Sequence, residues 1–170
     1  AKSGTAAAEV TRAASVPSVA FSSAHSVAGN GVYLLSFLAG RDVPAIVAYS
    51  IAQGRRNFGA LIPKSAYGQV VERAFRSAVS SQGGQLVAVE QIPLDANAML
   101  EPAKRIAEYT KSDDPSIPPR IDALFMPIGQ EHLPTVAALM PYFEIDTNRV
   151  KLLGTVLWDY PNIGRETPLV

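Results

Sequence analysis

The apolar positions between residues 58 and 94 change their period twice, which predicts a strand, a helix and a second strand. A short apolar run from Phe58 to Ile62 is closed by Pro63. Apolar residues then recur at the three- and four-residue spacing of one helical stripe. Gly83 and Gly84 favour a helix end, because glycine tolerates the left-handed backbone of a C-cap, and a β-rich run follows over 86–92. The stripe consists of Tyr67, Val70, Val71, Ala74, Phe75, Ala78 and Val79.

The rest of the chain repeats this alternation. Further helices are expected over 5–14, 42–53, within 99–109 and over 133–140, and further strands over 18–21, 33–38, 121–128 and 150–154. Pro44 and Pro134 suit the first turn of a helix, Pro102 suits a first turn or a kink, and Pro141 is expected to end the helix over 133–140. The order from residue 58 is β-α-β-α-β-α-β, ending in an irregular loop over 155–163. It predicts an α/β fold: a three-layer, open, mainly parallel sheet with helices on both faces.

Composition narrows the function classes. Of the 170 residues, 48% are hydrophobic and 18% charged, which is enough apolar material for a core. Lys plus Arg and Asp plus Glu are 15 each, so the basic excess typical of nucleic-acid binding is absent. The chain has no cysteine, which excludes disulfides and thiolate metal sites. It starts at Ala1 rather than Met, and we expect a processed or excised piece.

The sequence lacks the motifs that would indicate an enzyme or a metal protein. Gly29-Asn30-Gly31 has no third glycine and is followed by a strand-like segment, so it predicts a turn rather than a dinucleotide site. His25 and His132 stand outside any metal-ligand spacing, and no G-x-S-x-G elbow is present. Asp113-Asp114 lies in a Pro-rich segment that is typical of a solvated loop. We therefore expect no enzyme activity, no cofactor and no metal.

Polar and aromatic residues do follow the predicted strands. In an open α/β sheet, ligands bind beyond the carboxyl ends of the strands. The corresponding loops, 22–26, 64–67, 128–130 and 155–159, carry groups that suit a small polar ligand. For Tyr67 and Trp158 the alternative is that both side chains only cap the core. The candidate ligand-binding residues are Ser22, Ser23, His25, Tyr67, Gln130, Thr155, Trp158 and Asp159.

Several of these segments carry a family resemblance. VPSVAFSS, IPKSAYGQVVERAFRSAVSSQGGQLVAVEQIPL, IDALFMPIG and VKLLGT resemble the type I periplasmic binding proteins, the leucine/isoleucine/valine-binding group. SVAGNGVYLLSFL and MPYFEIDTNRVKLLGTVLWD look like the branch of penicillin-binding protein activators in proteobacteria. The resemblance covers nearly the whole chain.

This resemblance implies a two-lobed, periplasmic, non-enzymatic protein, with a lipoprotein anchor as an option, that holds its ligand between the lobes. Full members are roughly twice as long as this chain. Residues 1–53 would be the last part of the N-terminal lobe, and residues 54–170 most of the C-terminal lobe. We also expect a chain of this extent to self-associate, because an incomplete lobe exposes apolar sheet edges.

The resemblance assigns roles to only a few positions. Ser22 and Ser23 match the loop that contacts the ligand carboxylate in the amino-acid binders, and Tyr67 matches their cleft tyrosine. The acidic residue that holds the ligand's α-amino group in those binders would fall near Thr155, where no acid is present. Asp159 is displaced from that position by several residues. This departure argues against ordinary amino-acid binding.

Two function hypotheses follow. In the first, the protein binds a small polar ligand, such as an amino acid or a peptide, and delivers it to the membrane subunits of an ABC transporter or to a sensor. In the second, it activates a peptidoglycan synthase by direct contact. The first predicts a polar cleft where Ser22, Ser23 and Tyr67 converge, and the second predicts a cleft filled by side chains such as Trp158.

Overall fold

The computed structural model describes residues 18–20, 32–34, 39–95, 97–112, 114, 116–161 and 163. It divides into two compact units, residues 1–39 and 40–170. In the first unit, strands β1 (Ser18–Ala20) and β2 (Val32–Leu34) pair in parallel. The helix expected over 5–14 and the turn at 29–31 lie outside the described residues. The expected lobe boundary at residue 53 falls at the far end of helix α2 (Ala39–Ala52), and the assignment of the units to lobes stays a prediction.

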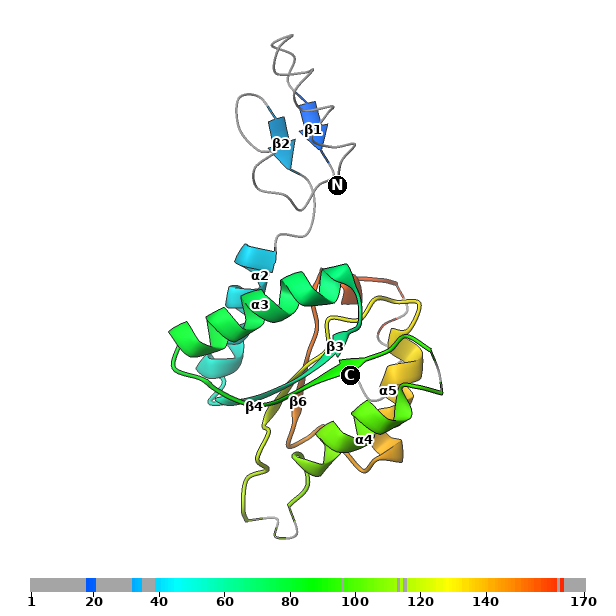
Figure 1. The fold of residues 1–170 in the computed structure, drawn as a ribbon. Coiled ribbons are helices and arrows are strands. Elements are labelled where there is room, and N and C mark those ends of the chain that lie inside the picture. Colours follow the sequence, from blue (N-terminus) through cyan, green and yellow to red (C-terminus); the bar gives the residue numbers. More distant parts are fainter. Residues whose placement is uncertain are drawn as a thin grey trace. The chain divides into compact units, whose positions relative to one another are not determined.

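The second unit is built on a parallel sheet of four strands (Figure 1). Its strands are β3 (Asn57–Pro63), β4 (Gln85–Ile92), β5 (Ala123–Phe125) and β6 (Lys151–Leu153), in the spatial order β4-β3-β5-β6. Each neighbouring pair is parallel. The predicted α/β fold with a mainly parallel sheet is therefore confirmed.

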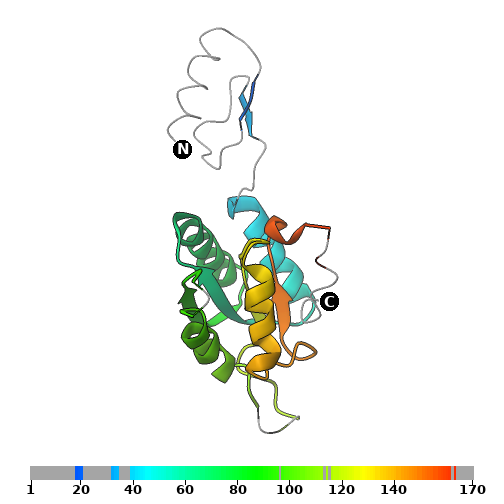
Figure 2. The same cartoon turned by 90° about the vertical axis from the view of Figure 1, so that its right-hand side faces the viewer.

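Helices cover both faces of this sheet. They are α2, α3 (Ala66–Ser81), α4 (Leu100–Glu108) and α5 (Leu133–Tyr142), with a short 3-10 helix, η2 (Val156–Trp158), after β6. α3 lies on one face, and α4 and α5 lie on the other (Figure 1). Gln82 at the end of α3 donates to the carbonyl of Pro44 in α2, which ties these two helices together. Figure 2 shows orange β6 between the yellow α5 and the cyan α2.

The ends of α3 follow the signals in the sequence. Ser65 is its N-cap, and the Ser65 Oγ accepts from the Gly68 N–H at 3.0 Å. Gly83 has a φ of 75°, which supplies the left-handed residue after the helix. Gly68 lies against the end of β3, where a Cβ would be 1.9 Å from the Pro63 carbonyl oxygen. Only glycine therefore allows α3 to start this close to its strand.

The core has two sides of different composition. On the α3 side, Phe75 meets Phe58 edge-on at 5.8 Å between ring centroids and stacks on Phe125 at 4.4 Å. This cluster joins α3 to β3 and β5. On the α4 and α5 side, the core is aliphatic and methionine-rich, with buried residues that include Leu61, Ile92, Met99, Ile106, Leu124, Met126, Leu133, Val136 and Met140. Alternating residues of β3 and β5 serve the two sides, as the period of a strand requires.

Several predicted boundaries are wrong. α2 begins at Ala39 rather than at residue 42, so Pro44 lies inside the helix and not in its first turn. α5 does not end before Pro141 but continues to Tyr142, since the N–H of Phe143 still donates to the Leu139 carbonyl. The strand expected over 121–128 is confined to β5, because Pro127 has no N–H to continue the ladder beyond Met126. No helix within the described ranges is long and apolar enough to cross a membrane.

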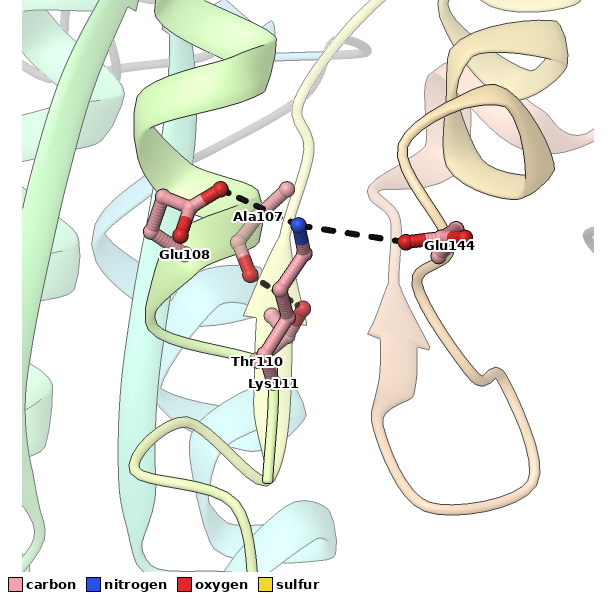
Figure 3. A network of polar contacts seen from close by, with 5 residues as sticks. All are labelled: Ala107, Glu108, Thr110, Lys111 and Glu144. Carbon is pink, nitrogen blue, oxygen red and sulfur yellow. Dashed lines mark hydrogen bonds and ion pairs between the residues drawn. The ribbon is translucent and has the colours of Figure 1, made fainter. Parts of the chain in front are cut away.

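Lys111 connects the ends of α4 and α5 (Figure 3). Its Nζ lies 3.1 Å from Glu108 Oε1 and 3.9 Å from Glu144 Oε2. Thr110 donates to the Ala107 carbonyl at 2.7 Å and closes the last turn of α4. The ion pairs are exposed, so they contribute little to stability, whereas the Thr110 hydrogen bond is buried.

Candidate ligand-binding edge of the sheet

The candidate site lies at the carboxyl edge of the four-stranded sheet. From β3 the chain crosses to β4 on one side, and from β4 it crosses back to β5 on the other side of β3. The connections therefore diverge between β3 and β5, which is where open α/β sheets bind their ligands. The connections after β3, β5 and β6 all start at this edge, and these connections, together with the first turn of α3 and with η2, contain five of the eight candidate residues.

Tyr67 and Thr155 come together at this edge. Tyr67 lies in the first turn of α3, held there by the Ser65 cap, and Thr155 follows β6. The Tyr67 hydroxyl lies 3.3 Å from Thr155 Oγ1, and either oxygen can donate. Thr155 is 6% exposed, and its Oγ1 also accepts from the Leu157 N–H. The structure thus joins two candidate residues that are 88 positions apart.

The Tyr67 hydroxyl is held in its neutral form. Burial is the largest effect and raises the pKa of Tyr67 above its ordinary value of 10.0. The hydrogen bond with Thr155 lowers this pKa, and the carboxylate of Asp42 in α2 raises it. Asp42 thus acts on the edge electrostatically, although no motif in the sequence links it to Tyr67. The edge offers a phenol that can both donate and accept a hydrogen bond at neutral pH.

Trp158 lies over the ends of β5 and β6. Its indole Nε1 donates to the Met126 carbonyl at 3.1 Å, and the half-buried ring packs against the core. A Cβ at Gly154 would be 2.0 Å from Trp158 Cδ2, so the ring rests directly on the backbone at this glycine. The same ring borders an apolar groove of about 490 Å³ between β6 and α2. Trp158 therefore caps the core, one of the two roles left open by the sequence.

The remaining candidates are less well placed. Gln130 and Asp159 are exposed in the loops after β5 and β6. Ser22, Ser23 and His25 lie outside the described residues, so their part in the site stays a prediction. Among the residues that the structure does describe, no three His, Cys, Asp or Glu side chains form a group that could hold a metal ion.

The two acidic residues at 113–114 were expected in a solvated loop. Asp113 lies outside the described residues, and Asp114 is exposed. Asp114 Oδ1 accepts from the Ser116 hydroxyl at 2.7 Å and from the Ser116 N–H at 2.8 Å. These hydrogen bonds lower the pKa of Asp114. For Asp114 the solvated-loop prediction is confirmed.

Comparison with solved structures identifies the fold. No protein-family model and no curated protein matches the chain. A branched-chain amino acid ABC transporter periplasmic ligand-binding protein from Burkholderia xenovorans LB400 matches with a TM-score of 0.68 and 17% identity, over 91% of this chain and 40% of that chain. A solute-binding protein of an ABC transporter from R. palustris, in complex with benzoate, matches with a TM-score of 0.70 and 14% identity, over 95% and 43%.

A third structure agrees with these two. It is a putative branched-chain amino acid ABC transporter protein from Rhodospirillum rubrum, with a TM-score of 0.68 and 13% identity, over 95% of this chain and 44% of that one. The chain thus spans 40–44% of the length of these three proteins. At 13–17% identity, the likeness shows the fold and leaves the ligand open. The chain has the α/β fold of the type I periplasmic binding proteins.

Proposed function

We propose that this chain is part of a non-enzymatic, extracytoplasmic solute-binding module that holds a small polar ligand for ABC-type transport or sensing. In this proposal, the second unit forms most of one lobe and the first unit belongs to the other lobe. The fold supports the proposal, because the similar solved structures are ABC transporter binding proteins.

The observation that carries the proposal is the pair of hydroxyls at the carboxyl edge. Tyr67 lies in the first turn of α3, Thr155 follows β6, and their oxygens lie 3.3 Å apart. Both groups can exchange this hydrogen bond for one to a ligand, because each can donate and accept. A few such convergent polar groups beside an aromatic ring are typical of small-molecule sites.

An amino acid or a peptide is the ligand class that we expect, with Ser22 and Ser23 holding its carboxylate. Benzoate, present in one of the similar structures, is a carboxylate without an ammonium group. The loop that starts at Thr155 has no acid before Asp159, which is the feature that would favour a ligand of this second kind. Both classes therefore belong in the test.

The test is a thermal-shift screen of the two-lobed protein that the proposal requires, against amino acids, short peptides, benzoates and muropeptides. A ligand that binds the folded state raises the melting temperature in a concentration-dependent way. Ser23→Ala and Tyr67→Phe should each reduce that rise. Tyr142→Phe is the matched control, because Tyr142 is 70% exposed at the end of α5. The proposal would be contradicted if a ligand raised the melting temperature of both variants as much as that of the parent. It would also be contradicted if no amino acid or other carboxylate raised the melting temperature.

A second candidate function rests on Trp158. The Trp158 ring covers Gly154, and the indole N–H already donates to the Met126 carbonyl. This part of the edge is therefore filled by protein. Such filling favours a penicillin-binding protein activator, which would contact a peptidoglycan synthase directly. Binding to a purified synthase, measured by calorimetry and combined with no shift across the ligand panel, would support this alternative over solute binding.

A further inference from the structure

A small cavity lies at the amino edge of the sheet, opposite the edge described above. Its volume is about 220 Å³, which is the liquid volume of roughly seven water molecules. It lies between the last turn of α2 and the first residue of β6. The lining residues are Tyr49, Ser50, Gln53, Arg55 and Lys151.

Two cations, Arg55 and Lys151, line this cavity. Among the residues that the structure describes, neither Arg55 nor Lys151 forms an ion pair. Within the described residues, Arg55 donates through Nη1 alone, to the carbonyls of Asp122 and Arg149. Its Nε–H and both Nη2–H groups have no partner among those residues. The carboxylate of Asp122 accepts instead from Arg56 and Asn57.

The end of α2 does not account for these cations. A positive charge often sits at a helix C-terminus because the last carbonyls lack partners. Here the carbonyls of Tyr49, Ser50 and Ile51 already accept from the N–H groups of residues 53–55. These three carbonyls therefore do not need the cations as partners.

Ser50 supplies an independent indication. The residue is 1% exposed, lines the cavity, and its Oγ has no hydrogen-bond partner among the described residues. A buried hydroxyl without a partner is costly, so native proteins generally provide one. A ligand toward which the Ser50 side chain turns could accept a hydrogen bond from its hydroxyl, which would remove this cost, and would also meet the two cations.

We infer that this cavity binds a small tetrahedral oxyanion, phosphate or sulfate. Its donors would be the Ser50 hydroxyl, the Gln53 amide, the free N–H groups of Arg55 and the Lys151 ammonium. They come from three parts of the second unit: α2, the segment before β3, and β6. Charge-assisted hydrogen bonds of this kind are the stronger ones in proteins. The site is independent of the proposed ligand edge.

The test combines affinity with stability on the 170-residue chain. Inorganic phosphate and sodium sulfate are titrated at constant ionic strength, with chloride as the reference, and NMR follows Ser50, Gln53, Arg55 and Lys151. With at least one oxyanion, we expect saturable changes in NMR chemical shift that are confined to these residues. Ser50→Ala and Lys151→Gln should each weaken binding by roughly tenfold. Lys104→Gln, on the exposed face of α4, and Tyr67→Phe should leave it unchanged.

Ser50→Ala also gives a signature that a merely structural serine would not. Without oxyanion it should raise the melting temperature, because it removes a buried hydroxyl that lacks a partner. Saturating phosphate should raise the melting temperature of the parent chain, and it should raise that of Ser50→Ala much less. The inference is overturned if chloride produces the same shifts, if Ser50→Ala binds phosphate as tightly as the parent, or if it lowers the melting temperature without oxyanion.

Discussion

The two edges of the four-stranded sheet are held by different chemistry. At the carboxyl edge, the contact between loops is a hydrogen bond of two neutral hydroxyls, Tyr67 and Thr155. At the amino edge, the Asp122 carboxylate accepts from the N–H of Asn57 at 2.9 Å, from its side-chain amide at 3.1 Å and from the Arg56 N–H at 3.3 Å. The neighbouring Arg55 guanidinium donates to two carbonyls.

The hydrogen bonds to Asp122 are expected to be stronger than the hydrogen bond between Tyr67 and Thr155. Hydrogen bonds to a charged group contribute about 1.5–3 kcal/mol, and a neutral pair contributes about 1 kcal/mol. The amino edge therefore fixes β3 against β5 through Asp122. Under the proposed function, a ligand at the carboxyl edge would take the place of the weaker contact between Tyr67 and Thr155.

The largest expected effect comes from the backbone contact that positions the carboxyl edge. Gly68→Ala would place a Cβ 1.9 Å from the Pro63 oxygen, which forces α3 away from β3. We expect a loss of about 3 kcal/mol or more in the free energy of unfolding, measured by urea denaturation. Gly129→Ala is the matched control at the same edge, since no atom lies within 4 Å of its Cβ position. Equal stability of the two variants would show that α3 can move without cost.

Asp122→Ala tests the hydrogen bonds at the amino edge. It removes the acceptor for two backbone N–H groups and for the Asn57 amide. We expect a loss of about 2 kcal/mol in the free energy of unfolding. The comparison variant is Asp159→Ala at the carboxyl edge, where the carboxylate is exposed, and the expected change is within about 0.5 kcal/mol. If Asp159→Ala costs as much as Asp122→Ala, the proposed difference between the edges is wrong.

Much of this fold could be predicted from local patterns. The stripe from Tyr67 to Val79 and the glycines after it predict α3 and its end, and both are confirmed. The errors arise where one proline decides the outcome. Pro127 ends β5 early because it lacks an N–H, and Pro141 is tolerated in the last turn of α5 because the next amides still find carbonyls.

The candidate site was predictable only in part. The rule that ligands bind at the carboxyl edge selected Tyr67 and Thr155, and the structure brings them together. Contacts with main-chain atoms carry no such signal, so neither the bond from Trp158 to the Met126 carbonyl nor its contact with Gly154 was foreseen. The influence of Asp42 on Tyr67 was also missed, since it depends on how α2 packs.

Tyr67→Phe removes the hydroxyl that makes the neutral contact. We expect a loss of about 1 kcal/mol in the free energy of unfolding near neutral pH. Burial raises the pKa of Tyr67 above 10.0, so the folded chain keeps a proton that the unfolded chain releases. The stability of the parent therefore falls as the pH rises above about 10, and this part of the fall is absent in the variant. The difference in the free energy of unfolding between the parent and Tyr67→Phe should narrow from about pH 9 to about pH 11. A constant difference would contradict the burial of this hydroxyl.

The smallest effect is expected from Ser116→Ala, in the exposed loop before β5. The Ser116 hydroxyl and then its N–H lower the pKa of Asp114 from its ordinary value of 3.8. Removing the hydroxyl should raise this pKa part of the way back, because the N–H bond of 2.8 Å remains. A lowered carboxyl pKa stabilises the folded chain above about pH 3.8, and this contribution is lost as the pH falls. The variant should therefore lose less stability on acidification than the parent does.

NMR titration of the Asp114 carboxyl measures the change in its pKa, and Ser77→Ala on the exposed side of α3 serves as the control. An unchanged Asp114 titration in Ser116→Ala would mean that the backbone alone sets this pKa. The loop would then add no side-chain electrostatics to this end of the molecule.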